Sequence, residues 1–261
     1  MPLLEVRDLR VRFGGIIALD SVSFDVPDDA IVGLIGPNGA GKTTLFNVIS
    51  RFYPVERGDL VFRGESLLHQ RSQNIIRRGI ARTFQNVELW PRMTVLDNVL
   101  AGYHSRFHTD YLHFVRAGLR LPGTRHMETE ARDKALEILR YMGLERVAGH
   151  PARGHPFGVL KKIELARALA SAPSLLLLDE PAGGLTHEEV DRLAGQLRQI
   201  HADFKVTLLI VEHHMNLVMR VSDRVVVLDF GRLIAEGTPR EVQTDARVIE
   251  AYLGTQQNGA P

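Results

Sequence analysis

No other stretch restricts the possible folds of this chain as strongly as residues 36–44, which read Gly-Pro-Asn-Gly-Ala-Gly-Lys-Thr-Thr. They fit the phosphate-binding pattern G-x-x-x-x-G-K-[ST], which requires a buried strand before it and a helix after it. Residues 30–35 are apolar, as a buried strand requires, and residues 44–49 have helical character. The sequence therefore predicts an α/β fold in which a strand, a loop and a helix form one phosphate-binding unit.

A triphosphate is a dense anion, and several features of this loop would bind it. Three glycines lack a Cβ atom, so the backbone can turn with positive φ and its N–H groups can approach the phosphates. The helix that follows directs the positive end of its dipole at the same anion. Lys42 adds a full charge near the β- and γ-phosphates, and the Thr43 hydroxyl is placed to ligate Mg²⁺. The predicted nucleotide contacts are Gly36, Pro37, Asn38, Gly39, Ala40, Gly41, Lys42, Thr43 and Thr44.

A second signal is a run of four leucines at positions 175–178, followed by Asp179 and Glu180. Such a run is typical of a strand buried on both faces in a parallel sheet, and ligands bind at the carboxyl ends of such strands. Asp179 is predicted to hold Mg²⁺ through water, and Glu180 to orient or deprotonate the water that attacks the γ-phosphate. The alternative, an acidic pair that merely ends a strand, is weakened by the independent phosphate loop.

Three further residues are ambiguous when each is taken alone. Gln85 ends a predicted strand and can reach a metal ion or its water, but an ordinary surface glutamine is the better interpretation of it alone. His213 follows the buried strand at 206–212 and can hydrogen-bond a γ-phosphate, although a lone histidine there is usually incidental. Phe13 ends the first of two early strands and can stack on a base, although core packing is the more common role.

Composition narrows the class of protein. With 261 residues the chain can bury a proper core, and its 32 basic and 31 acidic side chains lack the basic excess of a nucleic-acid binder. No apolar run approaches the roughly 20 residues that span a bilayer, and the N-terminus lacks the apolar core of a secretory signal. The absence of cysteine excludes disulfides and thiolate metal sites and is compatible with a reducing cytosol.

The remaining patterns outline the domains. Alternating strands precede the phosphate loop, and residues 224–237 read as a hairpin before a last helix at 239–253. No strand pattern appears between Gln85 and about residue 170, so a helical insertion is expected there, with Thr94 as an N-cap and a helix at 128–142. Three histidines of this insertion lack an acidic or thiol ligand to complete a metal site, and we expect them to be solvated: His104, His108 and His113.

In this order, the pieces resemble an ABC ATPase, and the likeness covers nearly the whole chain. Residues 36–44 match its Walker A motif, residues 175–180 match Walker B with its catalytic Glu180, and residues 183–186 match its D-loop. Gln85 matches the Q-loop and His213 the switch histidine, which makes both of them implied catalytic and nucleotide-contacting residues. Phe13 takes the place of the aromatic residue that stacks on adenine, and Gln85 and Asp179 take the role of Mg²⁺ ligands.

The resemblance implies an α/β P-loop NTPase (RecA-like) core with an N-terminal antiparallel β subdomain and an inserted α-helical subdomain. The core is expected at residues 1–88 and 166–237, the helical signature subdomain at 89–165, and a C-terminal helix and tail at 238–261. ATP and Mg²⁺ are the implied cofactors.

Within that superfamily, the chain resembles the ATP-binding subunits of branched-chain amino acid importers. The matching stretches are residues 12–15, 81–85, 93–95, 211–213 and 248–254. This resemblance implies a second ATPase subunit bound head-to-tail, two membrane permease subunits and, indirectly, a periplasmic solute-binding protein, with no nucleic acid. It implies a peripheral protein at the cytoplasmic face of the inner membrane. Urea importers have very similar ATPases, so urea, an amide or another solute stays an alternative.

The signature motif departs from the family pattern. A sequence close to Leu-Ser-Gly-Gly-Gln is expected before a helix, and residues 155–159 read His-Pro-Phe-Gly-Val instead. Gly158 is kept and would contact the partner's nucleotide in trans, but Pro156 offers neither a hydroxyl nor an N–H at the serine position. Because each signature completes the partner's site, we expect one of two composite sites to be impaired and the partner to be a different ATPase. Thr186 and His187 also replace the Asn or Asp and the Pro usual in the D-loop, which puts communication between the sites in question.

Three other functions stay open. A soluble ABC ATPase that acts on nucleic acid or ribosomes usually has two cassettes or a long coiled coil, and neither pattern is present. A P-loop GTPase would carry an Asn-Lys-x-Asp motif, which the sequence lacks. A non-hydrolysing regulatory subunit is favoured by the altered signature, and a Glu180→Gln variant would distinguish it from an active enzyme. The transported solute is not predicted by the motifs, because it never touches this subunit.

Overall fold

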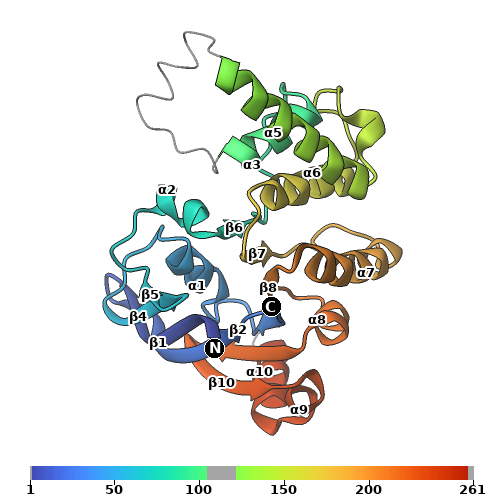
Figure 1. The fold of residues 1–261 in the computed structure, drawn as a ribbon. Helices are drawn as coiled ribbons and strands as arrows, with labels where there is room; N and C mark the ends of the chain where they lie inside the picture. The colour runs from blue at the N-terminus through green and yellow to red at the C-terminus, as the bar shows by residue number, and fades with distance from the viewer. Residues whose placement is uncertain (1, 105–121, 258–261) are drawn as a thin grey trace. The chain divides into compact units, whose positions relative to one another are not determined.

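The computed structural model describes residues 2–104 and 122–257 (Figure 1). The chain divides into two compact units, of which unit 1 comprises Met1–Ile75 and Ser174–Pro261, and unit 2 comprises Ile76–Pro173. The predicted solvation of His104, His108 and His113 concerns side chains outside those that the structure describes, and the last residues of the tail also fall outside.

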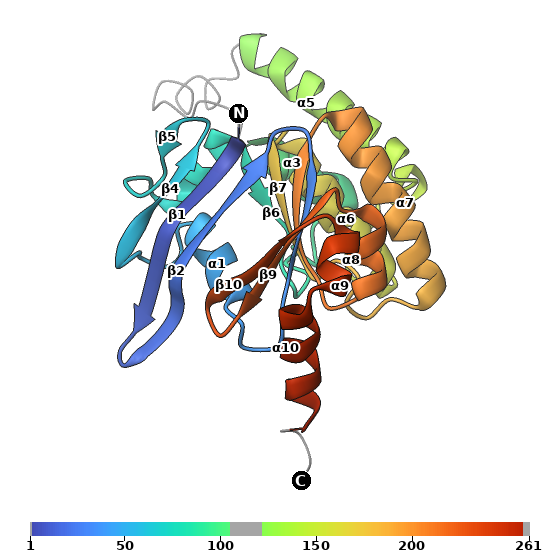
Figure 2. The same cartoon turned by 90° about the horizontal axis from the view of Figure 1, so that it is seen from below.

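Unit 1 begins with an antiparallel sheet in the order β2-β1-β4-β5. The long strands β1 (Pro2–Phe13) and β2 (Ile16–Pro27) form a hairpin, and β4 (Arg57–Phe62) pairs with β1 and with the short β5 (Glu65–Ser66) (Figure 2). Buried and exposed residues alternate in the second half of β2, as expected for a sheet with one covered face. The predicted early antiparallel strands are therefore confirmed.

The second sheet of unit 1 has the strand order β10-β9-β3-β8-β7. Pairing is parallel between β3 and both of its neighbours and between β7 and β8, and it is antiparallel between β9 and β10. Every residue of β3, β7 and β8 is buried, which explains why their sequences are apolar runs without alternation. The strands are β3 (Ile31–Ile35), β7 (Leu175–Asp179), β8 (Thr207–Val211), β9 (Arg224–Asp229) and β10 (Arg232–Gly237).

Helices α1, α7 and α8 of unit 1 each follow a strand of the parallel sheet. Helix α1 starts after the loop that leaves β3, and α7 and α8 pack against each other. They are α1 (Lys42–Ile49), α2 (Ser72–Ile75), α7 (His187–Phe204), α8 (Met215–Val221), α9 (Pro239–Thr244) and α10 (Ala246–Gln257).

The prediction of one continuous helix at 239–253 is wrong, because the chain forms two helices there. Asp245 has an extended backbone (φ −71°, ψ 120°) that ends α9. Its Oδ1 atom accepts a hydrogen bond from the Arg247 N–H at 2.8 Å, as an N-cap side chain does at the start of a helix. A short polar side chain therefore interrupts the helix at this position.

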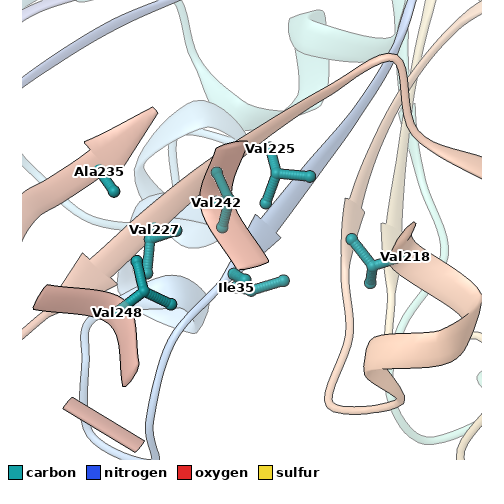
Figure 3. Close-up of a cluster of buried hydrophobic side chains, with 7 residues drawn as sticks. All are labelled: Ile35, Val218, Val225, Val227, Ala235, Val242 and Val248. Atoms are coloured by element: carbon teal, nitrogen blue, oxygen red, sulfur yellow. The ribbon is translucent and has the colours of Figure 1, made fainter. Parts of the chain in front are cut away.

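A buried aliphatic cluster connects the C-terminal helices to the sheet. Val218 of α8, Val242 of α9 and Val248 of α10 pack with residues of β3, β9 and β10 (Figure 3). Ile35, the last residue of β3, belongs to this cluster. The point where the phosphate loop leaves the sheet is thus anchored in the core. The members are Ile35, Val218, Val225, Val227, Ala235, Val242 and Val248.

Unit 2 is helical apart from one short strand within its described residues. Helices α3, α5 and α6 pack against one another. Thr94 caps α3 as predicted, since its Oγ1 atom accepts the Asp97 N–H at 3.0 Å. The elements are η1 (Ile76–Arg78), β6 (Ile80–Arg82), α3 (Val95–His104), α5 (Pro122–Tyr141), η2 (Glu145–Val147) and α6 (Phe157–Ala170).

Within residues 2–104 and 122–257, no helix combines the length and the apolar character that crossing a membrane requires.

Candidate nucleotide site

The phosphate loop leaves β3 and enters α1 through three glycines with positive φ. The φ values of Gly36, Gly39 and Gly41 are 152°, 81° and 100°. A Cβ atom on Gly36 would lie 2.1 Å from the Leu228 carbonyl oxygen, and one on Gly41 would lie 2.8 Å from the Ala18 carbonyl oxygen. A Cβ atom on Gly39 would meet nothing within 4 Å. Close packing therefore requires glycine at Gly36 and Gly41, whereas backbone conformation alone favours it at Gly39.

The loop is held from outside by the turn between β9 and β10. The Gly231 N–H donates to the Ala40 carbonyl at 3.0 Å, and the Asp20 N–H donates to the Gly231 carbonyl at 2.8 Å. Gly41 is the N-cap of α1, and no side chain caps this helix start. The loop and the first turn of α1 therefore fit an anionic ligand, which would satisfy N–H groups that no side chain covers.

Lys42 is the cation of this site. Its side chain is buried, and Nζ donates to the Gly36 carbonyl at 2.7 Å and to the Pro37 carbonyl at 2.8 Å. Burial lowers the pKa of Lys42, while the nearby charges of Glu180 and Asp179 act to raise it. The ammonium group thus lies against the loop, on the side of the two carboxylates, where a phosphate group would stabilise its charge.

The two acidic residues lie where the sequence predicts them, at the carboxyl end of β7. Asp179 is buried, with 4% of its surface exposed. Glu180 has a left-handed backbone (φ 47°), and its N–H donates to the Val211 carbonyl at 2.9 Å. A non-glycine residue in this region stores strain, which is typical of functional sites.

Glu180 and His213 are brought into direct contact. The Glu180 Oε1 atom lies 2.6 Å from the His213 Nε2 atom. The two residues end neighbouring strands of the sheet, because β7 pairs with β8. The contact between them is decided by the tertiary structure, since 33 positions separate them in the chain.

Sequence reasoning missed one buried carboxylate at this site. Glu212 is 1% exposed, and its Oε1 atom accepts the Ala182 N–H at 2.6 Å. Its Oε2 atom accepts the N–H groups of His213 at 2.9 Å and of His214 at 3.0 Å. The available signal was a charged residue at the end of an apolar strand, directly before the predicted histidine.

Phe13 is at the surface and not in the core, contrary to the interpretation that its position alone favoured. It is 41% exposed and contacts Tyr53 edge-to-face, with ring centroids 4.9 Å apart. Phe13 pairs with Ile16 at the end of the β1–β2 hairpin. Ile16 lies two residues before Ala18, which borders Gly41. An exposed aromatic face close to the phosphate loop is compatible with stacking on a base.

Gln85 belongs to unit 2, where its loop is tied to α6. The Gln85 carbonyl accepts a hydrogen bond from Lys161 Nζ at 3.1 Å, and the neighbouring Phe84 N–H donates to Glu164 Oε1 at 3.1 Å. Glu164 is 1% exposed. Burial raises the pKa of Glu164, and the bond from Phe84 and the charge of Arg167 oppose that shift. The roles of Gln85 as a metal and nucleotide ligand stay predictions.

The altered signature leaves the start of α6 intact. Pro156 is the N-cap (φ −55°, ψ 150°), and its carbonyl accepts the N–H groups of Val159 at 2.9 Å and Leu160 at 3.1 Å. No side chain caps this helix. The proline therefore keeps the helix but removes the hydroxyl that a serine would present next to Gly158.

The altered D-loop also keeps its helix start. The Thr186 Oγ1 atom accepts the Glu189 N–H at 3.4 Å, and the Glu189 Oε2 atom accepts the Thr186 N–H at 2.8 Å. This reciprocal pair is a capping box, in which threonine replaces Asn or Asp as the N-cap. The substitution is therefore conservative for the start of α7.

Comparison with known proteins agrees with this geometry. The family model described as ABC transporter matches residues 19–183, and a model described as branched-chain amino acid ATP-binding cassette transporter matches residues 232–257. The chain is 39% identical over 254 residues to the high-affinity branched-chain amino acid transport ATP-binding protein BraF of Pseudomonas aeruginosa, covering 97% of this chain and 98% of that protein. It is 40% identical over 256 residues to LivG of Escherichia coli, with the same coverage.

Solved structures give the same result. A nucleotide-free ATP-binding cassette from an ABC transporter aligns with a TM-score of 0.82 at 29% identity, covering 97% of this chain and 99% of that one. The ADP conformation of such a cassette aligns with a TM-score of 0.83 at 29% identity and the same coverage. With these matches, and with a phosphate loop, a buried lysine and an acidic strand end in one site, the chain belongs to the ABC transporter family, as one of its ATP-hydrolysing ATP-binding proteins.

Proposed function

We propose that this chain is the ATPase subunit of an importer for branched-chain amino acids, and that it couples ATP binding and hydrolysis to transport through membrane permease subunits. The role in ATP binding and hydrolysis is supported by the phosphate loop, in which Lys42 donates hydrogen bonds to two loop carbonyls near Asp179 and Glu180. The solute class is supported by the match of residues 232–257 to the branched-chain amino acid model and by full-length relatives with that role.

The residues of unit 1 fit a magnesium nucleotide. Within the described residues, no group of three His, Cys, Asp or Glu side chains could hold a metal by itself. Mg²⁺ is usually bound by one or two carboxylates together with substrate phosphates and water. Thr43, exposed on the first turn of α1, and the buried Asp179 supply the oxygen ligands that Mg²⁺ prefers. Bound Mg²⁺ would neutralise charge that develops on the phosphates.

The protein's own part in hydrolysis falls to Glu180 and His213. Glu180 would orient the attacking water and take its proton, since it is the carboxylate at the strand end beside the phosphate loop. His213, whose Nε2 atom lies 2.6 Å from Glu180 Oε1, would hold that carboxylate in position, and it would donate to a phosphate oxygen only when that contact is released. Phe13 would stack on the adenine ring.

The assembly would contain two ATPase subunits bound head-to-tail, in which Gly158 contacts the partner's nucleotide. Because Pro156 lacks the donors of a serine, we propose a heterodimer with one impaired composite site. Two permease subunits, and indirectly a periplasmic solute-binding protein, would complete the importer. The subunit would then be a peripheral protein on the cytoplasmic face of the inner membrane.

The solute is tested by deleting the gene in its host and measuring uptake of radiolabelled leucine and urea. Leucine uptake is expected to fall and to return with the wild-type gene but not with Lys42→Ala. Loss of urea uptake with normal leucine uptake would instead identify a urea importer.

The impaired site is tested by single-turnover hydrolysis on the reconstituted pair of ATPases, and two equally fast sites would contradict the proposal of an impaired site.

A further inference from the structure

The strongest feature outside the predicted motifs is the buried carboxylate of Glu212. It follows the last residue of β8 and is 1% exposed. A buried carboxylate needs hydrogen-bond donors or a cation, because its desolvation is otherwise very costly. Three backbone N–H groups supply that need, from Ala182 at 2.6 Å, His213 at 2.9 Å and His214 at 3.0 Å.

These bonds join two loops that end neighbouring strands. Ala182 lies two residues after Glu180 on the loop that follows β7, whereas His213 and His214 lie on the loop that follows β8. One carboxylate oxygen serves each loop, so a rigid group of three atoms sets their spacing. Hydrogen bonds to a charged acceptor are about twice as strong as neutral ones, which makes Glu212 an effective link.

The Glu180–His213 pair spans the same two loops. Its 2.6 Å contact requires both side chains to start from fixed backbone positions, and His213 is 43% exposed, so the surroundings of its ring restrain it little. A further connection between the two strand ends is the bond from the Glu180 N–H to the Val211 carbonyl, which fixes the first loop at its beginning. Glu212 adds the restraint beyond that point.

We propose that Glu212 is a positioning residue for ATP hydrolysis, which locks the loops after β7 and β8 together so that Glu180 and His213 meet in the productive geometry. Glu212 touches neither nucleotide nor water in this role. The proposal rests on the proposed ATPase function of the Glu180 site. It distinguishes Glu212 from the residues of the phosphate loop, which bind the nucleotide independently of it.

The test compares the full-length wild type with Glu212→Gln, each reconstituted with its partner ATPase. Glutamine has the same shape, but its NH₂ group cannot accept, so one of the two loops loses its acceptor. We expect kcat for ATP hydrolysis to fall at least about tenfold, as the loss of one charge-assisted bond would predict, while the Kd for ATP changes less than about twofold. The rate of ATP hydrolysis and, by calorimetry, the Kd for ATP are measured on the same preparations.

A matched control and a second variant complete the design. Asp223 Oδ2 accepts the Ile31 N–H at 2.8 Å at the opposite end of β3, so Asp223→Asn makes the same carboxylate-to-amide change far from the phosphate loop, and its amide oxygen can still accept that bond. It should leave kcat unchanged. Glu212→Asp keeps the charge but is one methylene too short to reach both loops, so its kcat should also fall.

Additivity shows whether Glu212 acts through the pair. In a His213→Ala background, Glu212→Gln should cost less than in the wild type, because the contact that it positions is already absent. The inference is overturned if Glu212→Gln and Glu212→Asp both hydrolyse ATP at the wild-type rate, or if kcat and ATP affinity fall in parallel. If the reconstituted wild-type pair binds ATP without hydrolysing it, the proposed function fails and not the positioning role alone.

Discussion

Two glycines of the phosphate loop should respond very differently to the same substitution. Gly36 and Gly39 both have positive φ, at 152° and 81°. A Cβ atom on Gly36 would lie 2.1 Å from the Leu228 carbonyl oxygen, whereas a Cβ atom on Gly39 meets no atom within 4 Å. Gly36→Ala therefore combines backbone strain with a collision against the main chain of β9, while Gly39→Ala produces backbone strain alone.

The expected magnitudes follow from that difference. A left-handed conformation costs an alanine about 1–2 kcal/mol, which is the whole expected loss for Gly39→Ala. Overpacking a close contact adds about 1–3 kcal/mol, so Gly36→Ala should lose about 2–5 kcal/mol. The loop must also move at Gly36 to relieve the clash, because Leu228 belongs to a buried strand of the core sheet.

The assay is urea denaturation of the two variants and the wild type, together with calorimetric titration of each with Mg-ATP. Gly36→Ala should be the less stable variant and should lose ATP affinity at least about tenfold, the equivalent of about 1.4 kcal/mol. Gly39→Ala should bind ATP within a few fold of the wild type. Equal losses for the two alanine variants, or a more damaging Gly39→Ala, would refute the packing argument for Gly36.

Three further predictions address other parts of the molecule. Burial raises the pKa of Glu164, so the native state holds that proton more tightly than the unfolded chain does, and stability falls as pH rises between the two pKa values. The melting temperature of Glu164→Gln relative to wild type should therefore increase with pH over that interval. A constant difference in melting temperature would contradict the reasoning. Burial raises the pKa of Tyr252 to about 12, and a hydrogen bond with the Gly36 backbone opposes the shift. Tyr252→Phe should weaken ATP binding about two- to tenfold in calorimetry. An unchanged affinity would show that this bond does not support the phosphate loop. Pro156→Ser should raise hydrolysis in the reconstituted ATPase pair while leaving ATP binding to this chain unchanged, and an unchanged rate would show that the missing donors are not the cause.

The local sequence was sufficient to predict a structural feature wherever the residues that cause the feature lie within one short segment. The phosphate loop, the leucine run of β7 and the capping residue Thr94 each satisfy a requirement of backbone geometry or burial within a few positions. The same is true of the early antiparallel hairpin, because alternation of apolar residues is a local pattern. The helix break at Asp245 was missed because an apolar periodicity continues across it.

Tertiary structure decided what depends on two segments meeting. The sequence indicates Glu180 and His213 as separate candidates, but only the pairing of β7 with β8 brings their side chains within 2.6 Å. The sequence did not single out Glu212, whose role depends on an N–H that another loop supplies in the folded chain. Gly36 is required by a carbonyl oxygen of β9, which lies far along the chain. The amino-acid sequence thus determines which chemical groups this protein has available, whereas packing between distant strands determines which of these groups act together. The reason is that side-chain contacts extend only a few ångströms in space and are independent of separation along the chain.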